Sequence, residues 1–519
     1  MHSIVLLFLC ATAALADNLT VSIAQGTLQG FMAGGSPTPA RAWLGIPYGT
    51  STSGQNRFKP SSPAHAWTGV RDASKFGAAC PQDDSNGMYG AQDEDCLNLN
   101  VYAPADSSAL SMRPVMIWIY GGSFTSGSNA LGLYQGANMC NNGNVIVVVI
   151  NYRLGVLGFP ASDIFFKESN TSGTFGLLDQ RLAMRWVRSN IAAFGGDPSR
   201  VTIFGESAGS ISVCFHLVMP GSAGLFHKAI MESGPCLQGT HGPNVNPRPW
   251  DQEGAKAQTN LAMAAANCST IACLRDAPLA TVMRAQTSLA WGPAIDLIEI
   301  PGDPLTLFTD GHNLQGIDTM LGSNTNEGTT FTIPWASTDQ QYRNKLLEDF
   351  GNQTTADAVY RMYPTAAFDN VPAYAYAAAV GDAFFWCPAR RLLDILESQG
   401  NQKTYAYHFN HVPSFIPFLP WEGVAHAFEL FFVWMNDMAP SPAWWNFTAP
   451  EAVLSKTMDD FWTSFATTGL PASRSATPPI GWPAYGTNRR VINLDLALSV
   501  SVDYRQVQCE FWDSLTPVR

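Results

Sequence analysis

The chain has 519 residues, of which 46% are hydrophobic and 13% are charged, and its net charge at pH 7 is −12. This hydrophobic content is enough for a large buried core and excludes an intrinsically disordered chain. The negative net charge argues against a nucleic-acid or anionic-membrane partner, because both carry negative charge that would repel the protein. The composition therefore predicts a globular protein.

The first residues form a short apolar run, from Ile4 to Leu15, that ends in Ala14-Leu15-Ala16. Such a run followed by a small-x-small triplet is typical of a secretory signal peptide, so we expect a signal at residues 1–16 and a mature chain at 17–519. A membrane anchor needs a longer apolar span, and no run of 18 or more apolar residues occurs elsewhere. We therefore expect a secreted, extracellular protein without a stable membrane anchor.

Glycosylation triplets and cysteines fit a secretory route. Ten cysteines include Cys10 in the signal, so nine remain in the mature chain and at least one thiol has no intrachain partner. No Cys-x-x-Cys or zinc-type grouping occurs, so we expect disulfides and neither a metal nor a cofactor. The Asn-x-Ser/Thr triplets make five glycosylation candidates: Asn18, Asn170, Asn267, Asn352 and Asn446.

In the N-terminal half the predicted elements alternate between strands and helices. Residues 18–31 indicate a hairpin, and residues 94–102 alternate like a strand. Residues 115–119 and 145–150 are apolar without alternation, which predicts buried strands, and apolar residues at helical spacing follow at 178–191. Strand, helix and strand in this rhythm predict a parallel sheet with right-handed crossovers.

A glycine pair directly follows the first of these buried strands, in Tyr120-Gly-Gly-Ser-Phe124. Glycines at this position permit backbone N–H groups to turn toward a ligand. We therefore assign half of an oxyanion hole to the N–H groups of Gly122 and Ser123.

The next predicted strand, at 201–204, ends in Gly205-Glu-Ser-Ala-Gly209, after which small and apolar residues favour a helix. A serine at such a strand-to-helix turn is held in a strained conformation with its Oγ exposed. The N–H of Ala208, at the start of the helix, is the other expected oxyanion donor. Ser207 is therefore the candidate nucleophile.

A nucleophilic serine needs a histidine to take its proton and a carboxylate to orient that histidine. Further strands are expected at 228–234 and 404–409, and residues 319–328 look like the end of a strand followed by a loop. Glu327 follows a strand, whereas Asp318 precedes it, so Glu327 is the preferred acid. His426 lies in a loop before an apolar run and is the preferred base, while His411 is a second candidate and His408 lies inside a strand.

Four motifs together resemble the type-B carboxylesterase/lipase family, which includes the cholinesterases: residues 94–100, 151–155, 194–198 and 201–209. The resemblance covers about Val21 to Trp512. It implies a single α/β-hydrolase domain at 17–519, with a large, mostly parallel central sheet, helices on both faces and sizeable insertions. It also implies the triad Ser207, Glu327 and His426 and the oxyanion donors Gly122, Ser123 and Ala208.

The resemblance further implies supporting polar residues and disulfides. Glu206 and Ser233 match polar positions beside the triad, and Arg57 and Glu94 match a structural ion pair. The implied disulfides are Cys80 with Cys96, Cys268 with Cys273, and Cys387 with Cys509. Three cysteines, Cys140, Cys214 and Cys236, are left over.

The expected function is hydrolysis of carboxylic esters, with a small-molecule ester as partner. Cys80 and Cys96 enclose a short segment, which offers little apolar cover for a lipid surface, so soluble short- to medium-chain esters are expected. Tyr89 is its only aromatic residue, so a choline-ester preference is not supported. The alternatives are a triacylglycerol lipase or sterol esterase and, from another class, a non-catalytic adhesion or binding protein.

Overall fold

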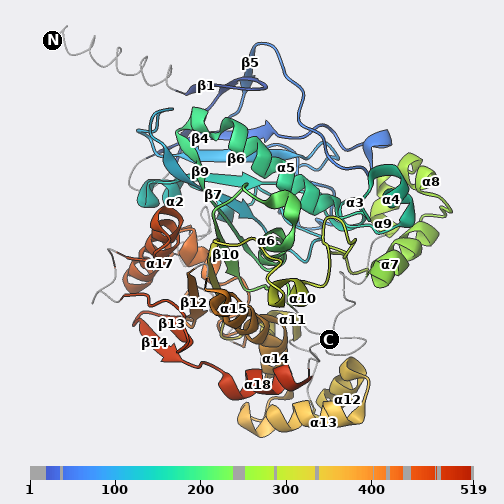
Figure 1. Ribbon diagram of the computed structural model, residues 1–519, viewed down its shortest axis with the longest axis vertical. Coiled ribbons are helices and arrows are strands. Elements are labelled where there is room, and N and C mark those ends of the chain that lie inside the picture. Colours follow the sequence, from blue (N-terminus) through green and yellow to red (C-terminus); the bar gives the residue numbers. More distant parts are fainter. Residues whose placement is uncertain are drawn as a thin grey trace.

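The computed structural model describes residues 19–34, 39–237, 252–285, 289–332, 338–400, 403–415, 421–436, 446–473, 475 and 481–515. The expected signal peptide, residues 1–16, and the candidate glycosylation site Asn18 lie outside these ranges. A central sheet runs through the molecule along its long axis, with helices packed against it (Figure 1).

The central sheet has eleven strands in the order β14-β13-β12-β11-β10-β9-β7-β8-β6-β4-β3. A smaller sheet, β1-β2-β5, contains the expected N-terminal hairpin, in which β1 and β2 are antiparallel. The strands are β1 (Thr20–Ile23), β2 (Gly26–Gln29), β3 (Phe31–Ala33), β4 (Ala40–Pro47), β5 (Val70–Asp72), β6 (Asn98–Ala103), β7 (Arg113–Ile119), β8 (Ile146–Ile150), β9 (Gly196–Glu206), β10 (Lys228–Glu232), β11 (Asp318–Asn324), β12 (Thr404–Phe409), β13 (Arg490–Leu494) and β14 (Ser499–Val502).

The middle of the central sheet is parallel and its margins are antiparallel. Strands β8, β7, β9, β10, β11, β12 and β13 run parallel in that spatial order. Strands β7, β8 and β12 are buried along their whole length, as expected where helices cover both faces of a parallel sheet. The predicted α/β fold with a mostly parallel sheet is confirmed.

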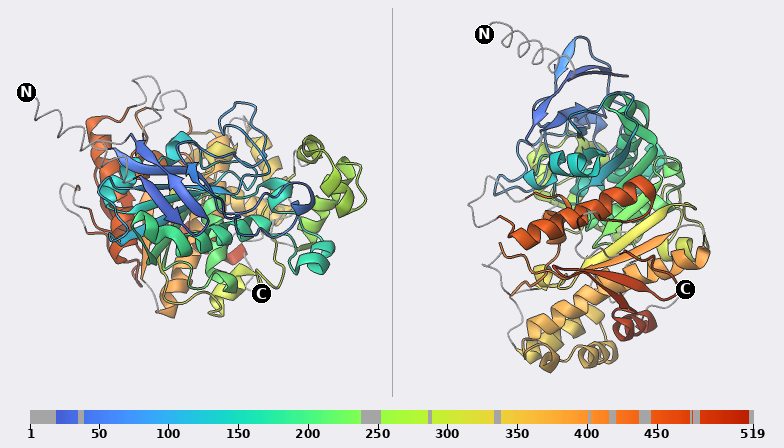
Figure 2. Two further views of the ribbon diagram at one scale, coloured as in Figure 1. Left: turned by 90° about the horizontal axis from the view of Figure 1, so that it is seen from above. Right: turned by 90° about the vertical axis from the view of Figure 1, so that its left-hand side faces the viewer.

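Helices cover both faces of the sheet. Helices α5, α6 and α15 pack on the strands from one side, and α2 and α17 pack together from the other, where Figure 2 (right) shows α17 lying across the molecule. The helices are α2 (Ala137–Gly143), α3 (Gly155–Gly158), α4 (Asp163–Ser169), α5 (Phe175–Asn190), α6 (Ala208–Val218), α7 (Gln252–Ala265), α8 (Ile271–Asp276), α9 (Leu279–Ala285), α10 (Pro304–Thr309), α11 (Thr329–Thr332), α12 (Asp339–Phe350), α13 (Gln353–Met362), α14 (Pro372–Gly381), α15 (Cys387–Gln399), α16 (Glu429–Val433), α17 (Ala449–Thr468) and α18 (Gln506–Leu515).

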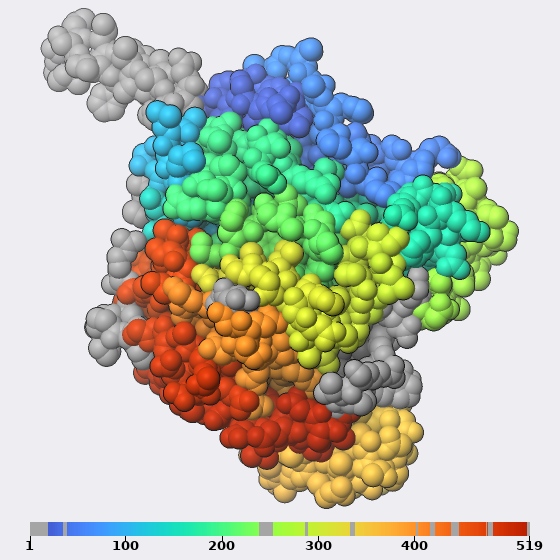
Figure 3. Space-filling view, in the orientation of Figure 1, coloured from blue at the N-terminus to red at the C-terminus, as the bar shows by residue number. Residues whose placement is uncertain are grey.

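Two groups of helices extend the chain between strands of the sheet. Helices α7, α8 and α9 lie between β10 and β11 in sequence, and α12 and α13 lie between β11 and β12. Figure 3 shows α12 and α13 as a separate lobe at the lower end of the molecule. Among the described residues, no helix has the length and apolar character that crossing a membrane would require.

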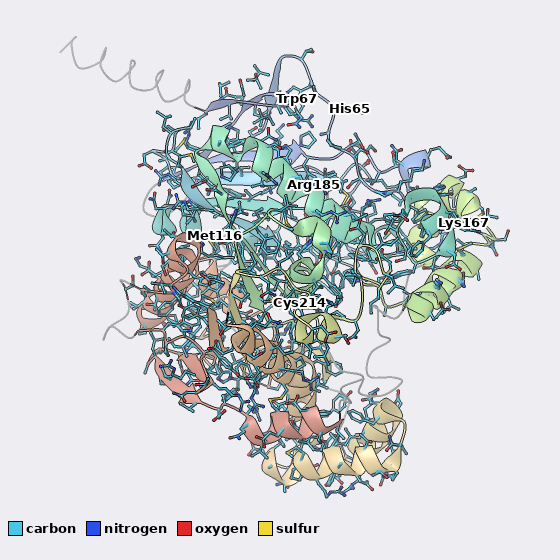
Figure 4. All side chains as sticks on the ribbon, in the orientation of Figure 1. His65, Trp67, Met116, Lys167, Arg185 and Cys214 are labelled. Atoms are coloured by element: carbon cyan, nitrogen blue, oxygen red, sulfur yellow. A yellow bond between two sulfur atoms is a disulfide. The ribbon has the colours of Figure 1, made fainter. Side chains whose placement is uncertain are left out.

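Four disulfides join cysteines of the described chain. Three are the pairs implied by the resemblance, Cys80–Cys96, Cys268–Cys273 and Cys387–Cys509. The fourth, Cys214–Cys236, uses two of the three cysteines left over in the sequence and ties α6 to the segment after β10 (Figure 4). Cys140 is a free, buried thiol.

Candidate active site

Ser207 occupies the sharp turn between β9 and α6. Its backbone angles, φ 55° and ψ −123°, lie outside the regions that non-glycine residues ordinarily adopt. Its N–H donates to the carbonyl of Glu232 at 2.9 Å, which ties the turn to the neighbouring strand β10. A strained serine fixed in this way presents its side chain beyond the end of the sheet.

The glycines on either side of Ser207 make this turn possible. A Cβ on Gly209 would lie 1.9 Å from the carbonyl oxygen of Ile119, the last residue of β7. A Cβ on Gly205 would lie 2.6 Å from the same oxygen. Both positions therefore exclude a side chain, since α6 begins in direct contact with the central strand.

Amide donors approach this turn from two segments. Ala208 is the first residue of α6, so its N–H is one of the amides that a helix leaves without an internal partner. The segment after β7 bends at Gly122 (φ 106°) and Ser123 (φ 54°). Gly122, Ser123 and Ser207 line one cavity, so the residues assigned to the oxyanion hole lie together around the serine.

This cavity, of about 350 Å³, lies beyond the carboxyl ends of the central strands. Its lining is mostly aromatic and aliphatic, with a few polar residues. Tyr89 brings the Cys80–Cys96 loop to its wall. The lining residues are Tyr89, Gly121, Gly122, Ser123, Gly127, Leu131, Leu133, Tyr134, Glu206, Ser207, Phe331, His426, Ala427, Phe428, Leu430 and Phe431.

His426 reaches this cavity from the segment between β12 and α16, and its side chain is 8% exposed. Its Nδ1 lies 2.5 Å from Oε2 of Glu327, which follows β11. The other oxygen of Glu327 accepts the N–H of Asn324 at 2.6 Å. The carboxylate is thus fixed by the end of its own strand, and it holds the imidazole through Nδ1.

Glu206, the residue before the serine, lies against the other side of the imidazole. Its Oε1 is 2.9 Å from Nε2 of His426, at ion-pair distance but outside hydrogen-bond geometry. Burial lowers the pKa of His426, but the charges of Glu206 and Glu327 outweigh burial and hold that pKa well above its usual range. Among the described residues, no hydrogen bond joins Ser207 Oγ to His426.

The alternative triad residues lie elsewhere. His411 is held between two carboxylates, with Asp495 at 2.9 Å and Glu451 at 3.1 Å. His408 contacts Thr325 and Tyr504, and burial lowers its pKa to about 4. Asp318 begins β11, at the opposite end of the strand from Glu327.

The structure adds two buried carboxyl groups that the sequence did not single out as site residues. Glu232 ends β10 and accepts Trp462 Nε1 at 3.0 Å, and burial raises its pKa well above the usual range. Burial, with the charges of Glu206 and Glu327, raises the pKa of Glu429 to about 8. Glu429 could have been found from its position three residues after His426, whereas no sequence motif surrounds Glu232.

Two phenylalanines that carry no sequence signal stack on each other and lie beside the imidazole, tilted to its ring by 58° and 55°. The rings of Phe331 and Phe385 each lie 5.0 Å from the ring of His426. Ser233 is fully buried, its Oγ has no hydrogen-bond partner, and it is not among the residues that line the cavity. The described residues contain no group of three His, Cys, Asp or Glu side chains arranged to hold a metal ion.

The Cys80–Cys96 loop is anchored next to this cavity. Arg57 donates to both carboxylate oxygens of Glu94, at 2.7 and 2.6 Å, and both side chains are buried. Gln82 accepts the N–H of Gly127 at 2.7 Å and donates to its carbonyl at 2.8 Å. These contacts hold Tyr89 at the cavity from a loop that is fixed at several points.

Comparisons with known proteins agree with this arrangement. The model of the carboxylesterase family matches residues 17–512. Para-nitrobenzyl esterase from Bacillus subtilis (strain 168) is 33% identical over 500 residues, covering 92% of this chain and 96% of that protein. Cholinesterase from Mus musculus is 30% identical over 550 residues, covering 96% and 87%.

A solved structure of a thermophilic pNB esterase superposes with a TM-score of 0.82 at 32% identity, covering 95% of this chain and 100% of that one. The match of the family model over nearly the whole length and the two relatives agree with the strand-turn-helix at Ser207 and its cavity. The chain therefore belongs to the carboxylesterase family and is an ester hydrolase.

Proposed function

We propose that this protein hydrolyses carboxylic esters through a triad of Ser207, His426 and Glu327 and a covalent acyl-enzyme. The observation that carries the proposal is the 2.5 Å contact between His426 Nδ1 and Glu327, in a cavity that the strained Ser207 also lines. This arrangement supports the assignment of a nucleophile, a base and a group that orients the base to one site.

In the first half-reaction His426 Nε2 takes the proton of Ser207 as Oγ attacks the ester carbonyl. The same imidazole then gives this proton to the departing alcohol, and the acyl group remains on Ser207. In the second half-reaction His426 deprotonates a water molecule, which attacks the acyl-enzyme and releases the carboxylic acid. Glu327 stabilises the imidazolium that forms in each half-reaction.

The negative charge that develops on the carbonyl oxygen is stabilised by the N–H groups of Gly122, Ser123 and Ala208. Each donor contributes about 3 kcal/mol to lowering the barrier, by analogy with the removal of single donors from such sites. Ser123 serves through its backbone, so its hydroxyl is not required. Glu206 acts on this step through His426, whose positive form its carboxylate favours.

The substrates are soluble short- to medium-chain esters. A cavity of about 350 Å³ walled by aromatic and aliphatic residues suits a small apolar ester. A similar protein is named for para-nitrobenzyl esters, which supports a small substrate. The short Cys80–Cys96 loop argues against a lipase that opens on lipid, and the proposed triad argues against a non-catalytic binding protein.

We further propose that residues 17–519 form a single domain and that the protein is secreted after removal of residues 1–16. The match of the family model to residues 17–512 supports the single domain, and four disulfides support an oxidising compartment. Asn170, Asn267, Asn352 and Asn446 are exposed, as glycan attachment requires.

The test is hydrolysis of a chromogenic ester series from acetate to palmitate by the wild-type protein and by Ser207→Ala. We expect turnover to peak at the shorter chains and to fall about a million-fold in Ser207→Ala. Ser210→Ala is the matched control, because Ser210 lies one turn away in α6, is buried, and its Oγ has no hydrogen-bond partner.

Each outcome separates the alternatives. Near-normal turnover in Ser207→Ala would contradict the triad. A peak at long chains would identify a lipase or sterol esterase, and no turnover of any ester would favour a binding protein.

A further inference from the structure

The segment that follows β10, residues 233–237, packs against the catalytic turn and is buried throughout. Just before it, the carbonyl of Glu232 accepts the N–H of Ser207 at 2.9 Å. A Cβ on Gly234 would lie 2.4 Å from the carbonyl oxygen of Ser207, so the two backbones are in direct contact. Both polar groups of the Ser207 backbone therefore meet this part of the chain, although none of residues 233–237 lines the cavity.

Few hydrogen bonds hold the 233–237 segment in place. The N–H of Ser233 donates to the carbonyl of Gly322 at 2.9 Å, and Pro235 has no N–H to donate. The N–H of Cys236 contacts Sγ of Cys214 at 3.0 Å, and no carbonyl oxygen among the described residues accepts the N–H of Gly234 or Cys236. The disulfide to Cys214 is therefore the main tie between the end of this segment and the rest of the protein.

The disulfide closes a ring that passes through the nucleophile. Cys214 follows Ser207 on α6 by seven residues, so roughly 10 Å of helix separates them at 1.5 Å per residue. The ring runs from Ser207 along α6 to Cys214, across the disulfide to Cys236, and back to Glu232, whose carbonyl holds Ser207. Because one side of the ring is a helix, the disulfide keeps the other side from moving away from it.

Ser207 needs this support because its backbone, at φ 55° and ψ −123°, is strained. Such a conformation persists only where the surrounding structure over-determines it. The contact with Gly234 is one of close packing, so it constrains Ser207 only while the segment stays against it. Relaxation of Ser207 would move its Oγ and the N–H of Ala208, and misplacing reacting groups by about 1 Å costs roughly 100-fold in rate.

We propose that the Cys214–Cys236 disulfide positions the nucleophile. It holds the 233–237 segment against Ser207 and thereby keeps Oγ and the N–H of Ala208 in the geometry that attack on an ester requires. Its two cysteines do not line the cavity, so they act through the backbone of Ser207 and not on the substrate. The inference rests on the proposed function, since it takes Ser207 as the nucleophile.

The test is steady-state kinetics of Cys214→Ala combined with Cys236→Ala on one chromogenic ester, at a temperature where circular dichroism shows the variant to be folded. We expect kcat to fall between about tenfold and 100-fold while KM stays within about twofold, because the cavity lining is unchanged. Cys268→Ala combined with Cys273→Ala is the matched control. It removes a disulfide whose cysteines also lie outside the cavity, and it should leave kcat within about twofold.

A second variant, Gly234→Ala, tests the same contact with the disulfide intact. Its Cβ must displace either the 233–237 segment or the carbonyl of Ser207, so kcat should again fall about tenfold or more. Gly481→Ala is its control, because a Cβ there meets no atom within 4 Å. This pair decides the question if the double cysteine variant fails to fold.

The outcomes separate positioning from stabilisation. A double cysteine variant with wild-type kcat and only a lower free energy of unfolding would overturn the proposal. An equal loss of kcat in the control disulfide variant, or wild-type kcat in Gly234→Ala, would overturn it as well. Failure of the proposed function is a different result: near-normal turnover in Ser207→Ala would remove the basis of both, whatever the disulfide variants show.

Discussion

The two ends of the central sheet carry cavities of similar volume, about 350 and 370 Å³, that differ in the charged groups that line them. At the carboxyl end, two carboxylates surround one imidazole and hold its pKa high. At the amino end, one guanidinium is buried with a single carboxylate contact. The first cavity has two carboxylates beside one imidazole, whereas Arg113 at the second cavity has one carboxylate partner.

This difference follows from how the two ends are built. At the carboxyl end the functional groups come from turns that directly follow β7, β9 and β11 and from the segment between β12 and α16, at the edge where ligands bind in α/β proteins of this kind. The strands fix these turns, so the geometry of several residues is set together. At the amino end the buried cation is one side chain, Arg113, which a single substitution removes.

The largest expected effect compares the two ends of one strand, β11. Glu327→Gln should lower kcat about 10⁴-fold, because the imidazole loses the charge that orients it and stabilises its protonated form. Asp318→Asn makes the same chemical change at the amino end of β11 and should leave kcat within a few fold. Steady-state kinetics on one chromogenic ester measures both, and equal losses would contradict the assignment of Glu327.

The next effect concerns the backbone after β7. A Cβ on Gly122 would lie 2.3 Å from the carbonyl oxygen of Ser126, so Gly122→Ala must displace the oxyanion loop. We expect kcat to fall roughly 100- to 1000-fold, the cost of losing one donor. Gly132→Ala is the control, because a Cβ there meets no atom within 4 Å. Similar kcat values in the two variants would exclude Gly122 from the oxyanion hole.

The turns at the carboxyl end of the sheet could be predicted from the sequence, because they require particular residue types. Gly205, Ser207 and Gly209 are recognisable because the close approach of α6 to β7 admits no side chain at either glycine. The apolar segments that became β7 and β8 are equally visible, since both faces of a central parallel strand are buried. These signals are local, so a single sequence contains them.

What the sequence could not supply depends on contacts between distant segments. Residues 94–102 alternate in polarity, yet every residue of β6 is buried, because Asn98 and Asn100 are satisfied by Asn129 inside the protein. Glu232 and Arg113 likewise carry no motif. Their importance arises from burial, which the spacing of residues along the chain does not reveal.

The pairing of Cys214 with Cys236 also could not be predicted from the sequence, and it gives the third prediction. Cys214 and Cys236 form a disulfide behind Ser207, whereas Cys140 is a free thiol that contacts the carbonyl of Ala137. Replacing Cys214 and Cys236 together by Ala should cost about 3 kcal/mol in free energy of unfolding, the loop-closure value for this separation. Cys140→Ala should cost about 1 kcal/mol, from the loss of a small buried group. Denaturant titration measures both, and a larger loss from Cys140→Ala would contradict the pairing.

The smallest expected effect concerns the charges around His426 at the carboxyl end of the sheet. His426 must be neutral to act as a base, and Glu206 and Glu327 raise its pKa, so kcat/KM should fall on the acid side from a pH above the usual histidine value of about 6.5. Glu206→Gln removes one of these charges, so the pKa falls and the acid limb moves to lower pH, by about one unit for a neighbouring carboxylate.

Asp495→Asn is the control for this shift, because it removes a carboxylate 2.9 Å from His411, a histidine outside the cavity. Its acid limb should coincide with that of the wild-type protein. If Glu206→Gln left the limb in place while lowering kcat, Glu206 would act by position alone. The charge balance at the carboxyl end of the sheet would then be set by Glu327 and by the buried Glu232 and Glu429, both of which burial favours in the neutral form.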